Sequence, residues 1–229
     1  MLKCHEHTKE LKMWKLTEAQ IKLVEMAGFK HLSMITDMSI DAPLISALVE
    51  RWRRETNSFH MRVGEMTITL EDVFLILGLP IDGDPVIGVT SHACESICRK
   101  LLGNVPRPEH RSGRMVKLSW LRESFSRCPE DASEEQIKRS TRAYLLYLLG
   151  CTIFSSSTGN KVPVMYLQFF ENFDDTKRYA WGAAALAYLY RALGNASLNG
   201  QTSICGSITL LQVIFTSYAI LYFLFPLQP

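Results

Sequence analysis

The sequence predicts a mainly α-helical protein, folded as a single multi-helix domain with one small β-hairpin near residues 58–69. Three observations predict this class. Several segments begin with helix-capping chemistry and continue with apolar residues at helical spacing. The apolar period changes from helical to alternating at only one place, which predicts the hairpin. Short connections and one continuous apolar pattern favour one domain over two.

Three capping boxes mark helix starts. In each, a Ser or Thr side chain accepts a hydrogen bond from the backbone three residues later, and the residue there reaches back. The pairs are Thr17 with Gln20, Thr69 with Asp72, and Ser133 with Gln136. We expect these helices to end near Gly28, Gly78 and Gly150, because glycine is favoured just past the last helical turn.

A fourth helix is predicted after Asp41, which is a plausible N-cap before Pro43. Its apolar stripe runs from Leu44 to Trp52 at helical spacing. The alternating segments that follow predict hairpin strands at Ser58–Arg62 and Met66–Thr69. Further helices are expected at about 92–102, 119–126, 164–171, 176–193 and 207–224, with loops at 81–89, 103–117 and 155–163.

Composition is that of a globular protein, with 47% hydrophobic and 21% charged residues among 229. The formal net charge of +2 is too small to indicate nucleic-acid binding by itself. Six cysteines share no tight spacing, which favours reduced thiols inside a cell. Residues 1–15 lack the apolar stretch of a secretory signal, so we expect none.

An ordered series of motifs resembles the plant mobile domain. The matching segments are Ala27–Leu32, Leu44–Arg53, Glu55–His60, Gly64–Val73, Leu77–Gly83, Lys117–Leu121, Arg142–Gly150, Gly159–Val162, Arg178–Gly182 and Leu186–Arg191. The resemblance covers residues 17–213, which leaves 1–16 as an N-terminal extension. After Val213 the pattern fails, so we expect 214–229 to be a divergent apolar tail and the end of the domain to be incomplete.

The family includes Maintenance of Meristems-like proteins and a region fused to plant long-form serine/threonine phosphatases, and some members carry an aminotransferase-like label. The resemblance therefore implies a nuclear, non-catalytic interaction or scaffold domain. It implies roles in meristem development, transposon silencing or gene-expression control. Nuclear proteins, including a phosphatase of the long-form type, are the implied partners. The resemblance supplies no reaction, no catalytic set and no cofactor.

A nucleic-acid-binding module derived from a mobile element is the alternative. Between Arg99 and Lys117 the only acidic residue is Glu109, so this expected loop can contact phosphates without reading sequence. A second basic group surrounds Trp52; in the plainer interpretation Trp52 is core and its arginines cover the helix end. The candidate contacts, to nucleic acid, chromatin or a protein partner, are Arg51, Arg53, Arg54, Arg99, Lys100, Arg107, Arg111, Arg114 and Lys117.

A membrane anchor is the third possibility, because Ile208–Leu227 is uncharged and about long enough to span a bilayer. Polar residues such as Gln212 interrupt the run, and no Lys or Arg flanks it closely. Its first half also matches a core helix of the family. Membrane insertion is therefore the less favoured interpretation.

Metal, phosphate and catalytic motifs are weak. Cys4–His7 and the set His92, Cys94 and Cys98 lack the paired spacing of zinc sites. We expect a frayed N-terminus and small buried thiols instead. Ser157–Lys161 lacks the spacing of a phosphate-binding loop. An enzyme would need at least two residues around one cleft from the set Glu50, His60, Asp72, His92 and Cys151.

Overall fold

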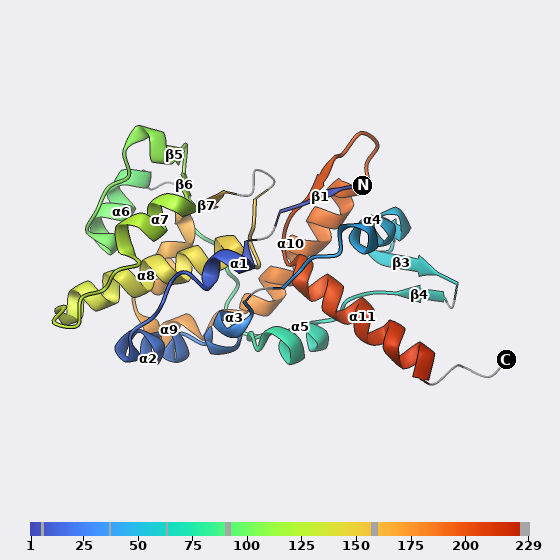
Figure 1. Cartoon of the computed structure of the whole chain (residues 1–229), viewed down its shortest axis with the longest axis horizontal. Helices are drawn as coiled ribbons and strands as arrows, with labels where there is room; N and C mark the ends of the chain where they lie inside the picture. Colours follow the sequence, from blue (N-terminus) through green and yellow to red (C-terminus); the bar gives the residue numbers. More distant parts are fainter. Residues whose placement is uncertain (6, 37, 63, 90–92, 157–159, 225–229) are drawn as a thin grey trace.

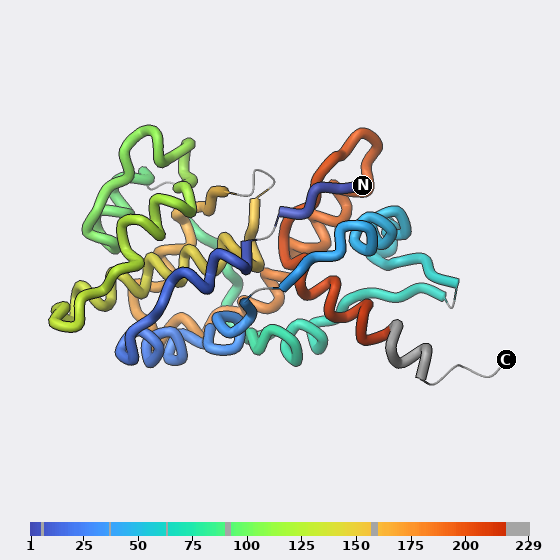
Figure 2. The backbone as a smooth tube through the Cα atoms, in the orientation of Figure 1, coloured from blue at the N-terminus to red at the C-terminus, as the bar shows by residue number. Residues whose placement is uncertain are grey.

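The structure is a computed structural model of the 229-residue chain. It describes residues 1–224 except 6, 37, 63, 90–92 and 157–159, and it describes side chains of the last helix as far as Tyr218. Figure 2 marks the remaining positions in grey. The chain is mainly α-helical, as expected, and its described residues form three small sheets where one hairpin was expected.

Helix α8 (Glu134–Cys151) is the central element. Every residue from Ser140 to Cys151 is buried, as expected of a helix whose apolar residues surround its axis. It is covered by other elements on several sides (Figure 1). These are α2 (Glu18–Met26), α6 (Cys94–Leu102), α7 (Leu118–Phe125) and the 3₁₀ helix η2 (Val164–Phe170).

The predicted capping chemistry is confirmed. All three capping boxes form, at the starts of α2, α5 (Leu70–Leu77) and α8. Asp41 accepts a hydrogen bond from the Leu44 backbone and caps α4 (Ala42–Arg51). Gly78 takes the left-handed conformation past the end of α5, with φ of 64°. A Cβ there would also lie only 2.7 Å from the His31 side chain.

A hairpin forms where it was expected, with strands β3 (Ser58–Met61) and β4 (Gly64–Met66). The expected second strand, Met66–Thr69, was wrong except for Met66, because β3 pairs with the residues directly after a tighter turn. The structure adds a third strand, β2 (Trp52–Arg53), antiparallel to β3. Trp52 was expected on the helical stripe, but its backbone is extended, with ψ of 129°. Its ring packs edge-on against Phe59 at 4.8 Å. This cross-strand pair favours the extended backbone at Trp52, so α4 ends one residue earlier, at Arg51.

Two expected loops contain regular structure. The region 103–117 holds the 3₁₀ helix η1 (Pro108–His110) and strands β5 (Arg111–Ser112) and β6 (Met115–Lys117). The region 155–163 supplies β7 (Lys161–Pro163), which pairs with β6. Strands of two or three residues are too short for alternation to be recognised in a sequence, so the prediction of bare loops was wrong here.

The expected helices at 164–171 and 176–193 also differ. The first is the 3₁₀ helix η2. The second begins only at Trp181, as α10 (Trp181–Ala196), after the separate short helix α9 (Phe173–Thr176). The break occurs because the backbone there bonds to a distant segment. Ala180 N–H donates to the Asp84 carbonyl, and Gly182 N–H donates to the Pro80 carbonyl. These long-range bonds replace bonds that a continuous helix would have made.

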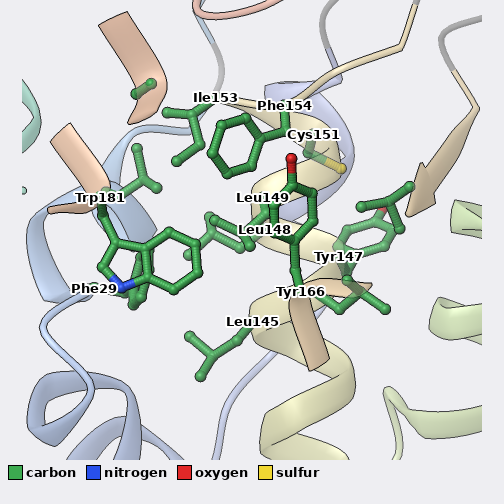
Figure 3. Packing of buried hydrophobic residues seen from close by; sticks show 14 of the residues in the cluster. Phe29, Leu145, Tyr147, Leu148, Leu149, Cys151, Ile153, Phe154, Tyr166 and Trp181 are labelled. Carbon is green, nitrogen blue, oxygen red and sulfur yellow. The ribbon is translucent and has the colours of Figure 1, made fainter. Parts of the chain in front are cut away.

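Trp181 lies at the centre of the aromatic core and is fully buried (Figure 3). Its ring packs edge-on to Phe29 at 5.1 Å and stacks on Phe170 at 5.7 Å. The indole N–H donates to the Thr176 carbonyl at 2.9 Å. A buried aromatic with a satisfied polar atom stabilises the junction of α9, α10 and η2.

The N-terminal extension is packed onto the rest of the chain, contrary to the expected frayed end. Strand β1 (Lys3–Cys4) pairs in parallel with β8 (Ser203–Ile204). After the short helix α1 (Thr8–Leu11), Trp14 is buried against Tyr144, with ring centroids 5.5 Å apart. The short α3 (Lys30–Met34) follows α2.

Helix α11 (Ile208–Leu224) begins inside the core, where Leu211 is fully buried and Phe215 packs against Phe59 at 4.7 Å. The expected helix at 207–224 is therefore confirmed. Among the described residues, no helix has both the length and the apolar content needed to cross a bilayer. The last part of the predicted tail, 225–229, lies outside the described residues.

Candidate functional site

The basic group around Trp52 lies where α4 ends and β2 begins. Arg51 is exposed, and its guanidinium donates to the Ala47 carbonyl at 2.9 Å, which closes the last turn of the helix. Arg53 and Arg54 are exposed as well. Trp52 is 2% exposed, so the interpretation of Trp52 as core is confirmed.

Arg53 and Arg54 nevertheless line a cavity of about 630 Å³. One wall comes from the end of α4 and from β2, and the other comes from Ala196 at the end of α10 and the loop to Gln201. Glu50 and Glu55 also line it, so the wall carries charges of both signs. This cavity brings together segments about 145 residues apart in the chain, which the sequence motifs do not reveal.

The second basic group, 99–117, is not one exposed loop, and several of its charges are paired. Lys100 lies 2.6 Å from the Glu171 carboxylate, and Arg111 lies 2.7 Å from that of Glu95. Arg107 is 3.9 Å from Glu109. These pairs reduce the positive field that the sequence alone predicts.

The remaining members of this group lie apart. Arg99 is on the exposed face of α6, and Arg114 follows Gly113 in the tight turn between β5 and β6. Lys117 is half-buried and lies directly opposite Lys161 in the β6–β7 ladder. Two ammonium groups in a cross-strand pair repel each other. Lys117 and Lys161 therefore form a small positive pair, and we group them with Arg114, which precedes β6, as the sheet patch.

No described cavity surrounds an enzyme-like set. Glu50 lines the cavity beside Arg54, but His60, Asp72 and Cys151 line none of the described cavities. Asp72 accepts bonds from the Thr69 backbone and hydroxyl, so it serves as a helix cap. His92, the fifth residue of this set, lies outside the described residues.

Two other charged residues of the motifs have structural contacts. Glu65 in β4 accepts a 2.8 Å hydrogen bond from Ser58 Oγ in β3, so it fixes the hairpin register. Arg142 is the buried cation of α8 and donates to the Phe170, Leu101 and Glu171 carbonyls. Burial lowers the pKa of Arg142. The negative charge of the Glu135 carboxylate, 3.5 Å away, acts in the opposite direction and raises it.

The thiols of Cys94 and Cys98 face each other on consecutive turns of α6, and both side chains are buried. Their mutual hydrogen bond lowers the pKa of Cys94 and raises that of Cys98. Among the described residues, no group of three or more His, Cys, Asp or Glu side chains is placed to hold a metal ion. Glu6, His92 and most of the candidate loop Ser157–Lys161 lie outside the described part of the chain.

Comparison with family models places residues 28–218 in one match, whose description is Plant mobile domain. The chain belongs to the plant mobile domain family. The resemblance drawn from the ordered motifs is therefore confirmed, and the match extends past Val213 into the apolar tail.

Three relatives of this plant mobile domain come from Arabidopsis thaliana. Protein MAIN-LIKE 2 is 64% identical over 92% of the chain, and Protein MAINTENANCE OF MERISTEMS is 52% identical over 93%. A serine/threonine-protein phosphatase 7 long form homolog is 40% identical over 84%. The chain spans 32%, 45% and 14% of the lengths of these relatives, respectively. No solved structure matches.

Sequence reasoning missed two features of this plant mobile domain. Lys161 was not grouped with Lys117, because their pairing depends on strand β7 in an expected loop. The cavity beside Arg54 was missed because its second wall, 196–201, carries no motif. No sequence signal marked the first feature, since the three residues of β7 are too few to show an alternating pattern.

Proposed function

We propose that this plant mobile domain is a non-catalytic interaction module that acts in the nucleus, in a protein of the Maintenance of Meristems kind. The observation that carries the proposal is the variety of its relatives. The domain matches proteins named for meristem maintenance and one named as a phosphatase long form homolog, while covering less than half of each. A domain that recurs in proteins with different names is typical of a binding module.

The charged motif residues support the same proposal. Asp72 caps a helix, Glu65 bonds Ser58 in the hairpin, and Arg142 satisfies buried carbonyls. Each therefore has a structural contact that explains its presence among apolar residues. A catalytic site instead needs titratable groups converging on one cleft, with pKa values matched to the reaction.

Helix α5 offers an apolar surface for a protein partner. Leu70, Phe74 and Leu75 are 40%, 51% and 71% exposed, whereas Val73 and Leu77 of the same helix are buried. Phe74 and Leu75 are the sort of side chains that anchor protein interfaces, and interfaces with nucleic acid are more polar and more positive. We define Leu70, Phe74 and Leu75 as the α5 face and assign it to contact with a protein.

The experiment is affinity capture from plant nuclear extract with the folded 229-residue chain as bait. A reproducible set of nuclear proteins is the expected result, since an interaction module retains partners without turning over a substrate. A fluorescent fusion should accumulate in the nucleus. Capture of nothing above the background of an unrelated helical protein would contradict the proposal.

A phosphatase of the long-form type is the partner that we propose to test first. The long form homolog contains a segment similar to this chain, and this shared segment is the reason for the choice. Calorimetric titration of the purified chain into that phosphatase should give a saturable isotherm. A flat isotherm at tens of micromolar would remove the phosphatase from the proposal.

Nucleic-acid contact is the second candidate function, and the sheet patch favours it. Lys117 and Lys161 place two like charges side by side, an arrangement that a bound phosphate would relieve. In a gel-shift salt series, replacing Arg114, Lys117 and Lys161 with Gln should reduce the slope of log affinity against log salt by roughly two to three. An unchanged slope would exclude this patch.

A further inference from the structure

Trp52, in the wall of the cavity beside Arg54, has a buried donor that lacks a partner among the described residues. Trp52 is 2% exposed, and its indole N–H finds no hydrogen-bond acceptor among the described residues. Trp52 lines the cavity together with Arg53 and Arg54. A buried N–H without an acceptor is unfavourable, so each case in a folded protein calls for an explanation.

The indole is held rigidly in place. Its ring packs against Phe59 at 4.8 Å and against Tyr190 at 5.3 Å. Tyr190 is itself fixed, because its hydroxyl donates to the Ile68 carbonyl at 2.5 Å. The Trp52 ring therefore has little freedom to turn its N–H toward another acceptor, and the acceptor must come to the N–H.

Arg54 lies next to this N–H, and Gly194 in α10 makes the approach possible. A Cβ on Gly194 would lie 3.6 Å from Arg54 Nε and 4.0 Å from Trp52 Nε1. Both donors are thus within 4.0 Å of one point beside the Gly194 backbone. Arg54 is exposed and has no ion pair among the described residues, so its guanidinium is available to a ligand.

The charges around the cavity select the kind of acceptor. Arg53 and Arg54 attract an anion, but Glu50 and Glu55 in the same wall repel a ligand with several negative charges. A run of phosphodiesters is therefore disfavoured, whereas a single carboxylate is tolerated. Val49 and Leu198, also in the wall, can contact apolar atoms on either side of that carboxylate.

We propose that this cavity binds one Asp or Glu side chain of an extended segment of a protein partner. The exposed Arg54 side chain turns to pair with the carboxylate, and the second carboxylate oxygen accepts from the Trp52 N–H. Charge-assisted bonds of this type are among the strong ones in proteins. The inference rests on the proposed function, because it supplies a contact for the interaction module.

The test follows indole N–H signals by NMR in the full chain. The four tryptophans give four signals, and Trp52→Phe assigns one of them. The probes are the capped tripeptide Gly-Asp-Gly, its Gly-Asn-Gly counterpart and inorganic phosphate. Trp14 is an internal control, because its buried N–H also has no partner among the described residues but lines none of the described cavities.

We expect a saturable downfield shift of the Trp52 signal with Gly-Asp-Gly, a much smaller shift with Gly-Asn-Gly, and none for Trp14. Arg54→Gln should weaken this binding about tenfold, which corresponds to about 1.4 kcal/mol. Arg51→Gln is the matched control, since this neighbour is equally exposed but does not line the cavity, and it should change the affinity little.

Three results would overturn the inference. The first is no saturable shift of the Trp52 signal, which would mean that water alone satisfies the N–H. The second is equal affinity for the Asp and Asn peptides, or tighter binding of phosphate. The third is an Arg54→Gln chain that binds as the wild type does. Nuclear proteins captured by the wild-type chain would then still support the proposed function, so the two failures are distinguishable.

Discussion

The side chain of Gln212 in α11 accepts a 2.7 Å hydrogen bond from the backbone N–H of Asp41, the N-cap of α4. The Gln212 amide also donates to the Ser39 carbonyl at 2.9 Å. A polar residue in an apolar helix thus joins two segments about 170 residues apart. This bond explains why the uncharged run starting at Ile208 is interrupted by a polar residue.

Replacing Gln212 with Ala should lower the free energy of unfolding by about 1 kcal/mol, because both hydrogen bonds are lost at a site where water replaces them in part. Urea denaturation monitored by circular dichroism measures the change. Ser217→Ala is the control, since Ser217 bonds only within α11 and is exposed. Equal stability of the Gln212→Ala variant and the wild type would contradict this role.

Replacing Arg142 with Leu should destabilise the fold by about 3 kcal/mol. Its side chain is 9% exposed and donates to three backbone carbonyls, of which those of Phe170 and Leu101 would be left buried without this donor. Arg139→Leu is the matched control. Arg139 pairs with the same Glu135, but its side chain is 40% exposed, so its loss should change the free energy of unfolding by less than about 1 kcal/mol. Equal effects of the two substitutions in urea denaturation would refute this account.

Much of the fold was predictable, and the reason is local chemistry. The capping boxes at Thr17, Thr69 and Ser133 each depend on two residues three positions apart, so the sequence shows them directly. Strand β7 depends on distant partners, and the break before Trp181 depends on bonds to Pro80 and Asp84. Such long-range backbone pairing overrides local pattern and leaves little trace in the sequence.

The candidate site was predictable only as a set of residue types. Arg53 and Arg54 were singled out because they flank an aromatic residue, and both do line a cavity. The orphan N–H of Trp52 was not predictable, because it depends on the close approach of Gly194. The salt bridges of Lys100 and Arg111 likewise depend on tertiary structure, so the charge of segment 99–117 was overestimated.

Alkaline pH should destabilise the protein through Tyr166. Burial raises the pKa of Tyr166 to about 12, partly opposed by Arg191. Because the folded protein binds this proton more tightly than the unfolded chain does, folding is favoured while the tyrosine is protonated. The contribution of Tyr166 to the free energy of unfolding is therefore complete below about pH 10 and is lost between about pH 10 and pH 12. Tyr166→Phe should reduce the stability lost in that window by roughly 2 kcal/mol.

Urea midpoints at pH 9, 10, 11 and 12 measure the effect of Tyr166→Phe. Tyr218→Phe is the control, because Tyr218 is exposed on α11 and a change there should leave the curve close to that of the wild type. A Tyr166→Phe curve that falls as steeply as the wild-type curve above pH 10 would show that Tyr166 ionisation is not involved.

Reversing one charge of the sheet patch should stabilise the protein. Lys161→Glu places a carboxylate opposite Lys117, so cross-strand repulsion becomes attraction worth about 0.2 to 1 kcal/mol. The melting temperature should rise with Lys161→Glu and fall back when Lys117→Glu is added to it. A lower melting temperature for Lys161→Glu alone would contradict the proposed repulsion between Lys117 and Lys161.

The most direct measurement for the interaction module is quantitative capture from nuclear extract with Phe74→Ser/Leu75→Ser, a change of two exposed residues of the α5 face. The control is Met13→Ser, since Met13 is 60% exposed and lies outside that face. Circular dichroism must first show that both variants are folded. We predict that the wild type and Met13→Ser retain the same nuclear proteins, and that the α5 variant retains at least about tenfold less. Equal recovery by all three chains, or recovery by none, would contradict the account.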